Sequence, residues 1–133
     1  MTKQAYITDI GSFLPNAPVD NDAIEGVLGM VAGKPSRSRK LVLRNNGIQT
    51  RYYAIDPATG RHTHTNAQMG AEAVRALARK SGFDLNTLEC LCAGTASPDS
   101  TQPAHGFMVH GELATPPCEI GRASCRERVS VLV

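Results

Sequence analysis

The sequence predicts an α/β fold, and three observations support this. Short β-type runs alternate with segments of helical periodicity, the clearest helical pattern covers residues 65–81, and a continuous apolar run follows at residues 88–93. The 133 residues make one domain or part of one, and 41% hydrophobic with 20% charged residues is typical of a globular chain. No apolar run is long enough to span a bilayer and no secretory signal pattern is present, so a cytoplasmic location is expected.

The N-terminal half is expected to contain two strands and two short helices. The stretch "AYITDIGSFLP" alternates as a strand that ends at Pro15. A helix is expected in "VDNDAIEGVLG", capped by Asp20 or Asn21, and another in "SRSRKLVLRNNG", capped by Ser36 and stopped by Gly47 in a left-handed conformation. The β-rich run "IQTRYYAI" follows, and then a turn at "DPATGR".

The second half begins with the clearest helix, "THTNAQMGAEAVRALARKSGF". Thr65 or Asn66 is expected to cap it, a narrow Ala- and Gly-rich face to pack closely, and Gly82 to end it. A buried strand is expected at residues 88–93, then the loop "SPDSTQP", then a helix in "AHGFMVHGEL". Three side chains of this last helix are expected to point inward: Phe107, Met108 and Leu113.

The charge distribution argues against a nucleic-acid partner. The net charge is +2, from 14 basic and 12 acidic residues. Four of these lie near the C-terminus: Arg122, Arg126, Glu127 and Arg128. Without them, 11 basic and 11 acidic residues remain, so the rest of the chain is neutral and has no basic footprint for nucleic acid. The local basic segment "KPSRSRK" is expected to be a solvated helix start.

No metal or phosphate site is expected from residue spacing. His62 and His64 stand two apart in "RHTHTN" without further ligands at metal spacing. Cys90 and Cys92 alternate along the expected strand, so they point to one face and are interpreted as packing residues. The glycine-containing stretches fit neither the dinucleotide nor the P-loop pattern. The residues alone therefore predict a soluble α/β domain without a stated function.

Cys125 is the one cysteine with a local environment suited to nucleophilic chemistry. It stands in "GRASCRERV", where arginines would lower the pKa of a thiol. The same arginines would be unpaired charges in an apolar core, so this stretch cannot be a buried strand that delivers a nucleophile.

Several strings together resemble the front of a ketoacyl synthase of the type III class, within the thiolase-like condensing enzymes. "AYITDIGSFLP" is similar to the family's opening strand and turn, and "VDNDAIEGVLG" to its first helix. "LRNNGIQTRYYA" is similar to the "RTGIxxRxxA" signature. The stretches "TNAQMGAEAVRALARKSGFDLNTLECLCAGTASPD" and "QPAHGFMVHGEL…PPCEI" resemble the blocks that follow, so the resemblance runs from Ala5 to about Glu119.

The resemblance implies a fold, a reaction and partners. The fold would be the incomplete N-terminal half of a thiolase-like α-β-α-β-α architecture, usually homodimeric. The intact parent would condense an acyl thioester with a malonyl carrier-protein thioester, with loss of carbon dioxide, in fatty acid or polyketide-type lipid synthesis. Its partners would be an acyl carrier protein and an acyl thioester; coenzyme A would enter as a substrate thioester, and no cofactor is expected.

The resemblance assigns no catalytic residue to this chain. The family's nucleophilic Cys, and its His and Asn, would lie after residue 119, and Cys118 comes too early. Arg44 would help to hold the coenzyme A or carrier-protein arm, and Gln102 and Pro103 would lie in the loop that reaches the partner subunit's acyl pocket. The family's tryptophan near the adenine is absent, because the chain has no Trp.

Residues 120–133 depart from the family pattern. Ile120–Val129 match, residue for residue, the translation of a DNA string that closely resembles a sequencing-library adaptor. We therefore expect residues 1–119 to be a truncated synthase, residues 120–133 to be a non-native tail, and the fragment to be inactive. The alternative is a small non-catalytic α/β module that uses the basic stretch 34–51 to bind a partner.

Overall fold

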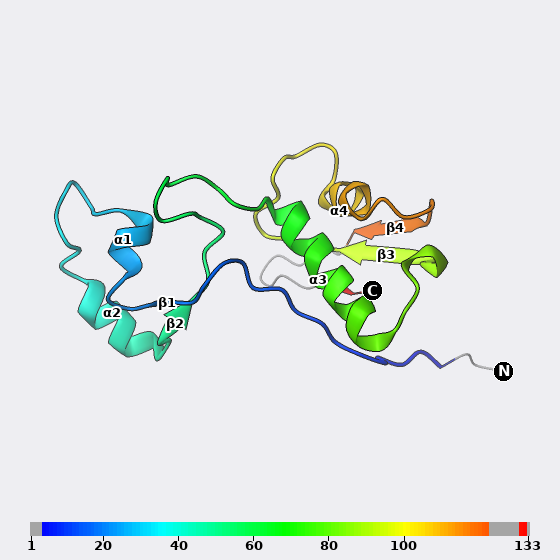
Figure 1. Cartoon of the computed structure of the whole chain (residues 1–133), viewed down its shortest axis with the longest axis horizontal. Helices are drawn as coiled ribbons and strands as arrows, with labels where there is room; N and C mark the ends of the chain where they lie inside the picture. Colours follow the sequence, from blue (N-terminus) through cyan, green and yellow to red (C-terminus); the bar gives the residue numbers. More distant parts are fainter. Residues whose placement is uncertain (1–3, 123–130, 133) are drawn as a thin grey trace. The chain divides into compact units, whose positions relative to one another are not determined.

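The computed structural model describes residues 4–122 and 131–132 and confirms the predicted α/β class (Figure 1). Its elements are β1 (Val19–Asp20), α1 (Ile24–Leu28), α2 (Arg39–Asn46), β2 (Thr50–Arg51), α3 (Asn66–Ser81), the 3-10 helix η1 (Leu85–Thr87), β3 (Cys90–Ala93), α4 (His105–Leu113), β4 (Glu119–Arg122) and β5 (Val131–Leu132). They form two compact units. Residues 14–65 make the α1–α2 unit, and the remaining described residues make the sheet unit. No helix within the described ranges could cross a membrane.

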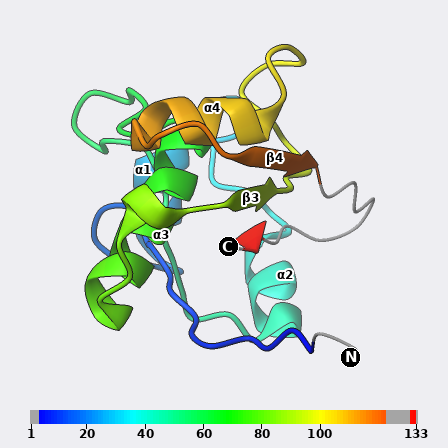
Figure 2. The same ribbon diagram turned by 90° about the vertical axis from the view of Figure 1, so that its right-hand side faces the viewer.

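The sheet unit is built on three strands in the order β4-β3-β5. β3 and β4 are parallel, with Cys90 opposite Glu119 and Ala93 opposite Arg122, whereas β5 pairs with β3 antiparallel. Helix α4 connects β3 to β4 and contacts both strands (Figure 2). A parallel pair needs such a crossover, so β3, α4 and β4 form a βαβ unit.

The core of this unit joins α3, α4 and β3 on one face of the sheet. Its buried members are Ala67, Ala71, Val74, Leu88, Leu91, Val109 and Leu113. The face of small residues predicted for α3 lets α4 pack closely against it. A Cβ on Gly70 of this face would stand only 3.1 Å from Cγ2 of Val109 on α4. The interpretation of this face as a packing surface is confirmed.

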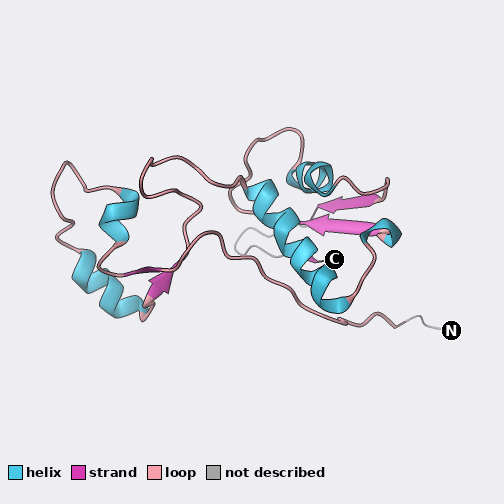
Figure 3. Ribbon diagram, in the orientation of Figure 1, coloured by secondary structure: helices cyan, strands magenta, loops and turns pink. Residues whose placement is uncertain are grey.

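The strand predicted at residues 5–15 is wrong. These residues form no strand, and no described strand pairs with them (Figure 3). The segment contacts α3 instead: Lys80 Nζ donates to Asp9 Oδ1 at 2.5 Å, and a Cβ on Gly11 would stand 2.7 Å from Leu77 Cβ. Alternation alone makes a segment compatible with a strand, but a strand also needs a hydrogen-bonded neighbour. The bond from Lys80, together with that from the Ile10 N–H, lowers the pKa of Asp9.

The inward face predicted for α4 is partly wrong. Leu113 is buried and Met108 packs against the core, as predicted, but Phe107 is 57% exposed. The buried positions are Gly106, Val109 and Leu113, which recur at helical spacing. A Cβ on Gly106 would stand 2.9 Å from Cγ2 of Ile120, so this glycine lets α4 lie close to the sheet.

The α1–α2 unit contains both predicted helices. Asp20 Oδ1 accepts from the Asp22 and Ala23 N–H groups just before α1, at 3.0 and 2.8 Å, and Gly47 ends α2 with φ 66°. The predicted cap of α2 is wrong, because the N-cap position is Ser38 and makes no side-chain cap bond. The Ser36 N–H donates instead to Glu25 Oε1 at 2.8 Å, which ties the start of α2 to α1.

The β-rich run at residues 48–55 forms less strand than predicted. Only Thr50–Arg51 is strand β2, which pairs antiparallel with β1. Ile55 adds an isolated bridge to His62, across the predicted turn. The run is otherwise held by side chains: Asn16 Nδ2 donates to the Tyr53 carbonyl at 2.7 Å. In that turn, bonds from Thr59 Oγ1 and the Ala58 N–H lower the pKa of Asp56.

Candidate functional site

The loop between β3 and α4, residues 94–104, is tied to the start of α3. Asp99 accepts through Oδ1 from the Asn66 N–H and through Oδ2 from the Ala67 N–H, both at 2.8 Å. Asn66 Nδ2 donates to the Ser97 carbonyl at 2.5 Å. The first N–H groups of a helix lack partners within the helix, and the helix dipole favours a negative charge there. Asp99 therefore fixes the loop to α3.

The sequence prediction did not include this contact of Asp99; the cap that it placed on Thr65 or Asn66 stays a prediction. Asp99 lies 33 residues from Asn66, so no local pattern reveals the contact. The only signal in the sequence is an acidic residue in a turn-rich loop, "SPDSTQP", that follows a buried strand.

Removing the Asp99 carboxylate is expected to weaken the sheet unit. We expect Asp99→Ala to lower the free energy of unfolding by about 1–2 kcal/mol, as loss of an N-cap does. Asp99→Asn keeps one acceptor oxygen and is expected to lose less. Urea denaturation followed by circular dichroism measures both variants, and equal stability of wild type and Asp99→Ala would refute the capping role.

Gln102 and Pro103 lie at the far end of this loop, next to α4. Both residues are exposed, and the peptide bond between them is cis. Ser100 Oγ donates to the Gln102 carbonyl at 3.1 Å and lies 3.5 Å from the Met108 Sδ. The loop is thus anchored at α4 as well as at α3. The role of Gln102 and Pro103 in a partner subunit's pocket stays a prediction.

The carboxyl ends of β3 and β4 meet at one edge of the sheet, because the two strands are parallel. The loop at residues 94–104 leaves this edge, and in open α/β sheets ligands bind outside the carboxyl ends of the strands. A nucleophile placed directly after β4 would therefore emerge here. Cys118 precedes β4 and packs against the core, so it lies at the opposite end of the strand. Cys125 falls outside the described residues.

The expected boundary between residues 119 and 120 falls inside β4. Ile120 pairs with Leu91 and Gly121 with Cys92. This pairing concerns the conformation of residues 119–122 and not the origin of the C-terminal stretch, so the boundary stays a prediction.

Cys90 and Cys92 share one face of β3, as predicted, with their Sγ atoms 3.7 Å apart. Cys92 is half-buried, and a Cβ on Gly121 would stand 2.4 Å from its Sγ. Cys90 is exposed, so the packing interpretation fits Cys92 and not Cys90. The hydrogen bond with Cys92, followed by desolvation, raises the pKa of Cys90. Within the described part of the chain, no group of His, Cys, Asp and Glu could hold a metal ion.

Arg44 lies in the last turn of α2, in the α1–α2 unit, and is exposed. Its side chain makes no ion pair among the described residues, whereas Arg39 and Arg51 of the same unit are engaged. Arg39 donates to Glu25 Oε2 at 2.8 Å, and Arg51 donates to Asn21 Oδ1 at 2.7 Å. Arg44 is therefore free to bind an anionic group, although its proposed ligand is not tested by this geometry.

Sequence comparison finds relatives among condensing enzymes. The chain is 27% identical over 113 residues to beta-ketoacyl-[acyl-carrier-protein] synthase III of Roseobacter denitrificans, covering 85% of this chain and 31% of the relative. It is 29% identical over 118 residues to the synthase III of Sphingopyxis alaskensis, covering 89% and 33%. The chain thus spans about a third of the length of the curated relatives that it matches. No family model matches the chain.

Solved structures of the same kind share the fold. A tetronic acid condensing enzyme superposes with a TM-score of 0.68 at 25% identity, over 86% of this chain and 34% of that one. The 3-oxoacyl-[acyl-carrier-protein] synthase III from Aquifex aeolicus superposes with a TM-score of 0.63 at 18% identity, over 86% and 33%.

The fold with its β3–α4–β4 unit thus defines the class as a partial, N-terminal thiolase-like fold. Within this class, the sequence comparisons are more specific. The chain is similar, at 27% and 29% identity, to about a third of the length of beta-ketoacyl-[acyl-carrier-protein] synthases III.

Proposed function

We propose that the whole protein catalyses decarboxylative condensation of an acyl thioester with a malonyl carrier-protein thioester. The observation that carries this proposal is the likeness to synthase III sequences over 85–89% of the chain. The names of these relatives include the acyl carrier protein, and one structural neighbour is a tetronic acid condensing enzyme. Fatty acid or polyketide-type lipid synthesis is the corresponding pathway class.

The reaction needs a nucleophile where β4 ends. A cysteine thiolate there attacks the acyl thioester, and the thiol of the first carrier leaves. The malonyl thioester then loses carbon dioxide and becomes an enolate, whose carbon attacks the enzyme-bound acyl group and displaces the cysteine. Hydrogen-bond donors that hold the oxyanion stabilise both steps. The carboxyl edge of β3 and β4 is suited to this chemistry, because the anchored loop and the start of α4 lie beside it.

Three residues of this chain have proposed roles in that enzyme. Arg44 would bind a phosphate of the coenzyme A or carrier-protein arm, because it is exposed and has no ion-pair partner among the described residues. Gln102 and Pro103 would border the acyl pocket of a partner subunit in a homodimer, because they lie exposed at the end of an anchored loop. The proposal requires no cofactor or metal.

The 133-residue chain itself is proposed to be inactive. Residues 120–133 would be a non-native tail, so the nucleophile and its His and Asn partners would be missing. Cys125 would then have no catalytic role.

Incubation of the chain with acetyl-coenzyme A tests this proposal. Intact-mass measurement is expected to show no acetyl group, and peptide mapping none on Cys125. Iodoacetamide serves as the control for thiol access and is expected to alkylate the exposed Cys90. Stoichiometric acetylation of Cys125, abolished by Cys125→Ser, would show that the chain carries its own nucleophile.

A further inference from the structure

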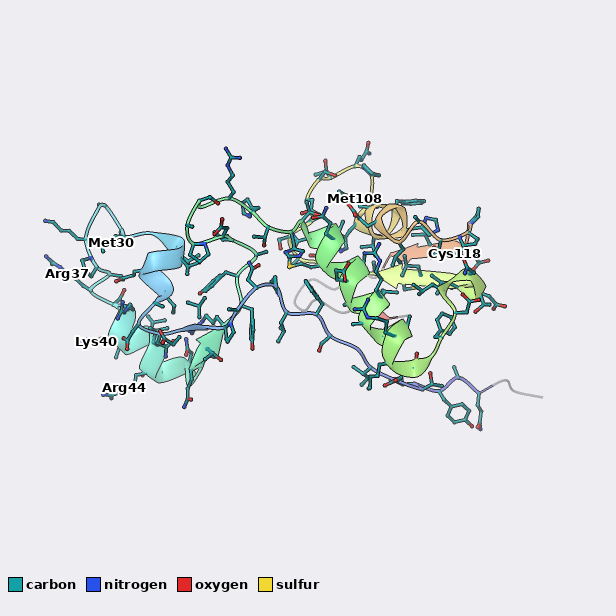
Figure 4. The ribbon with its side chains drawn as sticks, viewed as in Figure 1. Met30, Arg37, Lys40, Arg44, Met108 and Cys118 are labelled. Carbon is teal, nitrogen blue, oxygen red and sulfur yellow. The ribbon has the colours of Figure 1, made fainter. Side chains whose placement is uncertain are left out.

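The turn that follows α2 contains a chemically reactive pair, Asn46 and Gly47, to which the proposed function assigns no role. Asn46 is the last residue of α2 and comes shortly after Arg44 (Figure 4). It is the one asparagine in the sequence that a glycine follows. Both residues are exposed, so water reaches the peptide bond between them.

Hydrogen bonds hold the side chain of Asn46 against this peptide bond. Asn46 Oδ1 accepts from the Ile48 N–H at 2.9 Å, which is the contact of an Asx-turn. The ring that this bond closes contains the Gly47 nitrogen, so the Asn46 Cγ is held close to that nitrogen. Ile48 is fixed from its other side as well, because its carbonyl accepts from Asn21 Nδ2 at 3.0 Å.

The two nitrogens that would react are not tied to other groups in the described part of the chain. At the end of α3 the Gly82 N–H donates to a helix carbonyl at 2.9 Å, whereas the Gly47 N–H makes no such bond to a described residue. The side-chain amides of Asn16 and Asn66 donate to backbone carbonyls at 2.7 and 2.5 Å. The Asn46 amide has no comparable partner among the residues 4–122 and 131–132.

We propose that Asn46 is a site of spontaneous deamidation through the Gly47 nitrogen. Solvent base takes the proton from this nitrogen, which then attacks the Asn46 Cγ and forms a new C–N bond. Negative charge develops on Oδ1, where the Ile48 N–H already donates and stabilises it. The Cγ–Nδ2 bond breaks, the amide leaves as ammonia with a proton from water, and a cyclic succinimide remains.

Water then opens the succinimide at either of its carbonyls. Addition at Cγ restores the backbone and gives aspartate, whereas addition at the backbone carbonyl leaves the chain running through the side chain, as isoaspartate. The net reaction consumes water and releases ammonia, and no atom is oxidised or reduced. Either product places a carboxylate at the C-terminal end of α2, where the helix dipole disfavours a negative charge.

This inference does not depend on the condensing reaction, and its test uses no thioester. The 133-residue chain is incubated in mildly alkaline buffer, and fragmentation mass spectrometry follows the tryptic peptide of residues 45–51. We expect Asn46 to react about tenfold faster than Asn45, which is also exposed but precedes a residue with a Cβ that crowds the attacking nitrogen. Isoaspartate, detected by enzymatic methylation of its carboxylate, is expected beside aspartate.

A matched pair of glycine variants tests the role of Gly47. Gly47→Ala adds a Cβ beside the attacking nitrogen and is expected to slow the reaction of Asn46 about tenfold. Gly33→Ala is the control in the same unit, because Gly33 also has a positive φ, 72° against 66°, and an added Cβ meets nothing within 4 Å at either position. The backbone strain is therefore similar, and Gly33→Ala is expected to leave the rate within about twofold.

Unfolding the chain in guanidinium chloride tests whether the fold presents the pair. We expect no acceleration, because the folded turn already holds the Asn46 Cγ beside the Gly47 nitrogen. Four results would overturn the proposal: equal rates at Asn46 and Asn45, equal slowing by both glycine variants, aspartate without isoaspartate, and faster reaction in guanidinium chloride than in the folded chain.

Discussion

Replacing Leu91 by alanine is expected to lower the free energy of unfolding of the sheet unit by about 2–5 kcal/mol. Leu91 is 0% exposed at the centre of β3, and its side chain joins the core formed by α3 and α4. The substitution removes buried apolar atoms and leaves a cavity that the close-packed small face of α3 cannot fill. Urea denaturation measures the loss. Unfolding is followed by far-ultraviolet circular dichroism, because the chain has no tryptophan for fluorescence.

The matched control is Leu41→Ala on α2. Leu41 is 61% exposed, so the same chemical change is expected to cost less than about 0.5 kcal/mol. Equal losses for the two variants would mean that Leu91 is not in a packed core.

The second large effect is expected at Gly121, where β4 passes beside Cys92. A Cβ at this position would stand 2.4 Å from Cys92 Sγ, so Gly121→Ala forces the thiol or the strand to move. We expect a loss of about 1–3 kcal/mol, as for other overpacked sites. Cys92→Ala removes the clashing sulfur, and the remaining Cβ of residue 92 lies 3.5 Å away, an ordinary contact.

A double-mutant cycle makes this prediction specific. The double variant Gly121→Ala/Cys92→Ala is expected to lose less free energy of unfolding than the sum of the losses of the two single variants. Gly111→Ala is the control, because a Cβ there meets nothing within 4 Å on α4, and alanine favours a helix by about 0.5–1 kcal/mol. Additive single effects in the cycle would contradict the β3–β4 register.

The elements that depend on local sequence could be predicted. Helix α3 combines a small-residue face, basic residues in its last turn and, directly after it, Gly82 with φ 72°, so all three signals are local in the sequence. β3 was predicted from a short apolar run, and its pairing with β4 agrees with a βαβ order. In these segments, burial and local backbone preferences favour the same structure.

The features that depend on distant partners could not be predicted. The N-terminal alternation was interpreted as a strand, but no described strand pairs with it, and Lys80, about 70 residues away, holds it instead. Asp99 binds the first N–H groups of α3 from a distant loop, and Phe107 is exposed because Gly106, Val109 and Leu113 form the buried side of α4. The exposed Arg44 could be selected only through a resemblance, because an unpaired surface arginine has no local signature.

The most direct measurement of the central claim is the sequence of the source DNA downstream of the codon for Glu119. If the chain is part of a synthase III-like condensing enzyme, the reading frame is expected to continue from β4 as a small-residue strand into a cysteine at a helix start, and later to supply a histidine and an asparagine. A native stop codon soon after Val133 would contradict that account and favour a small binding module.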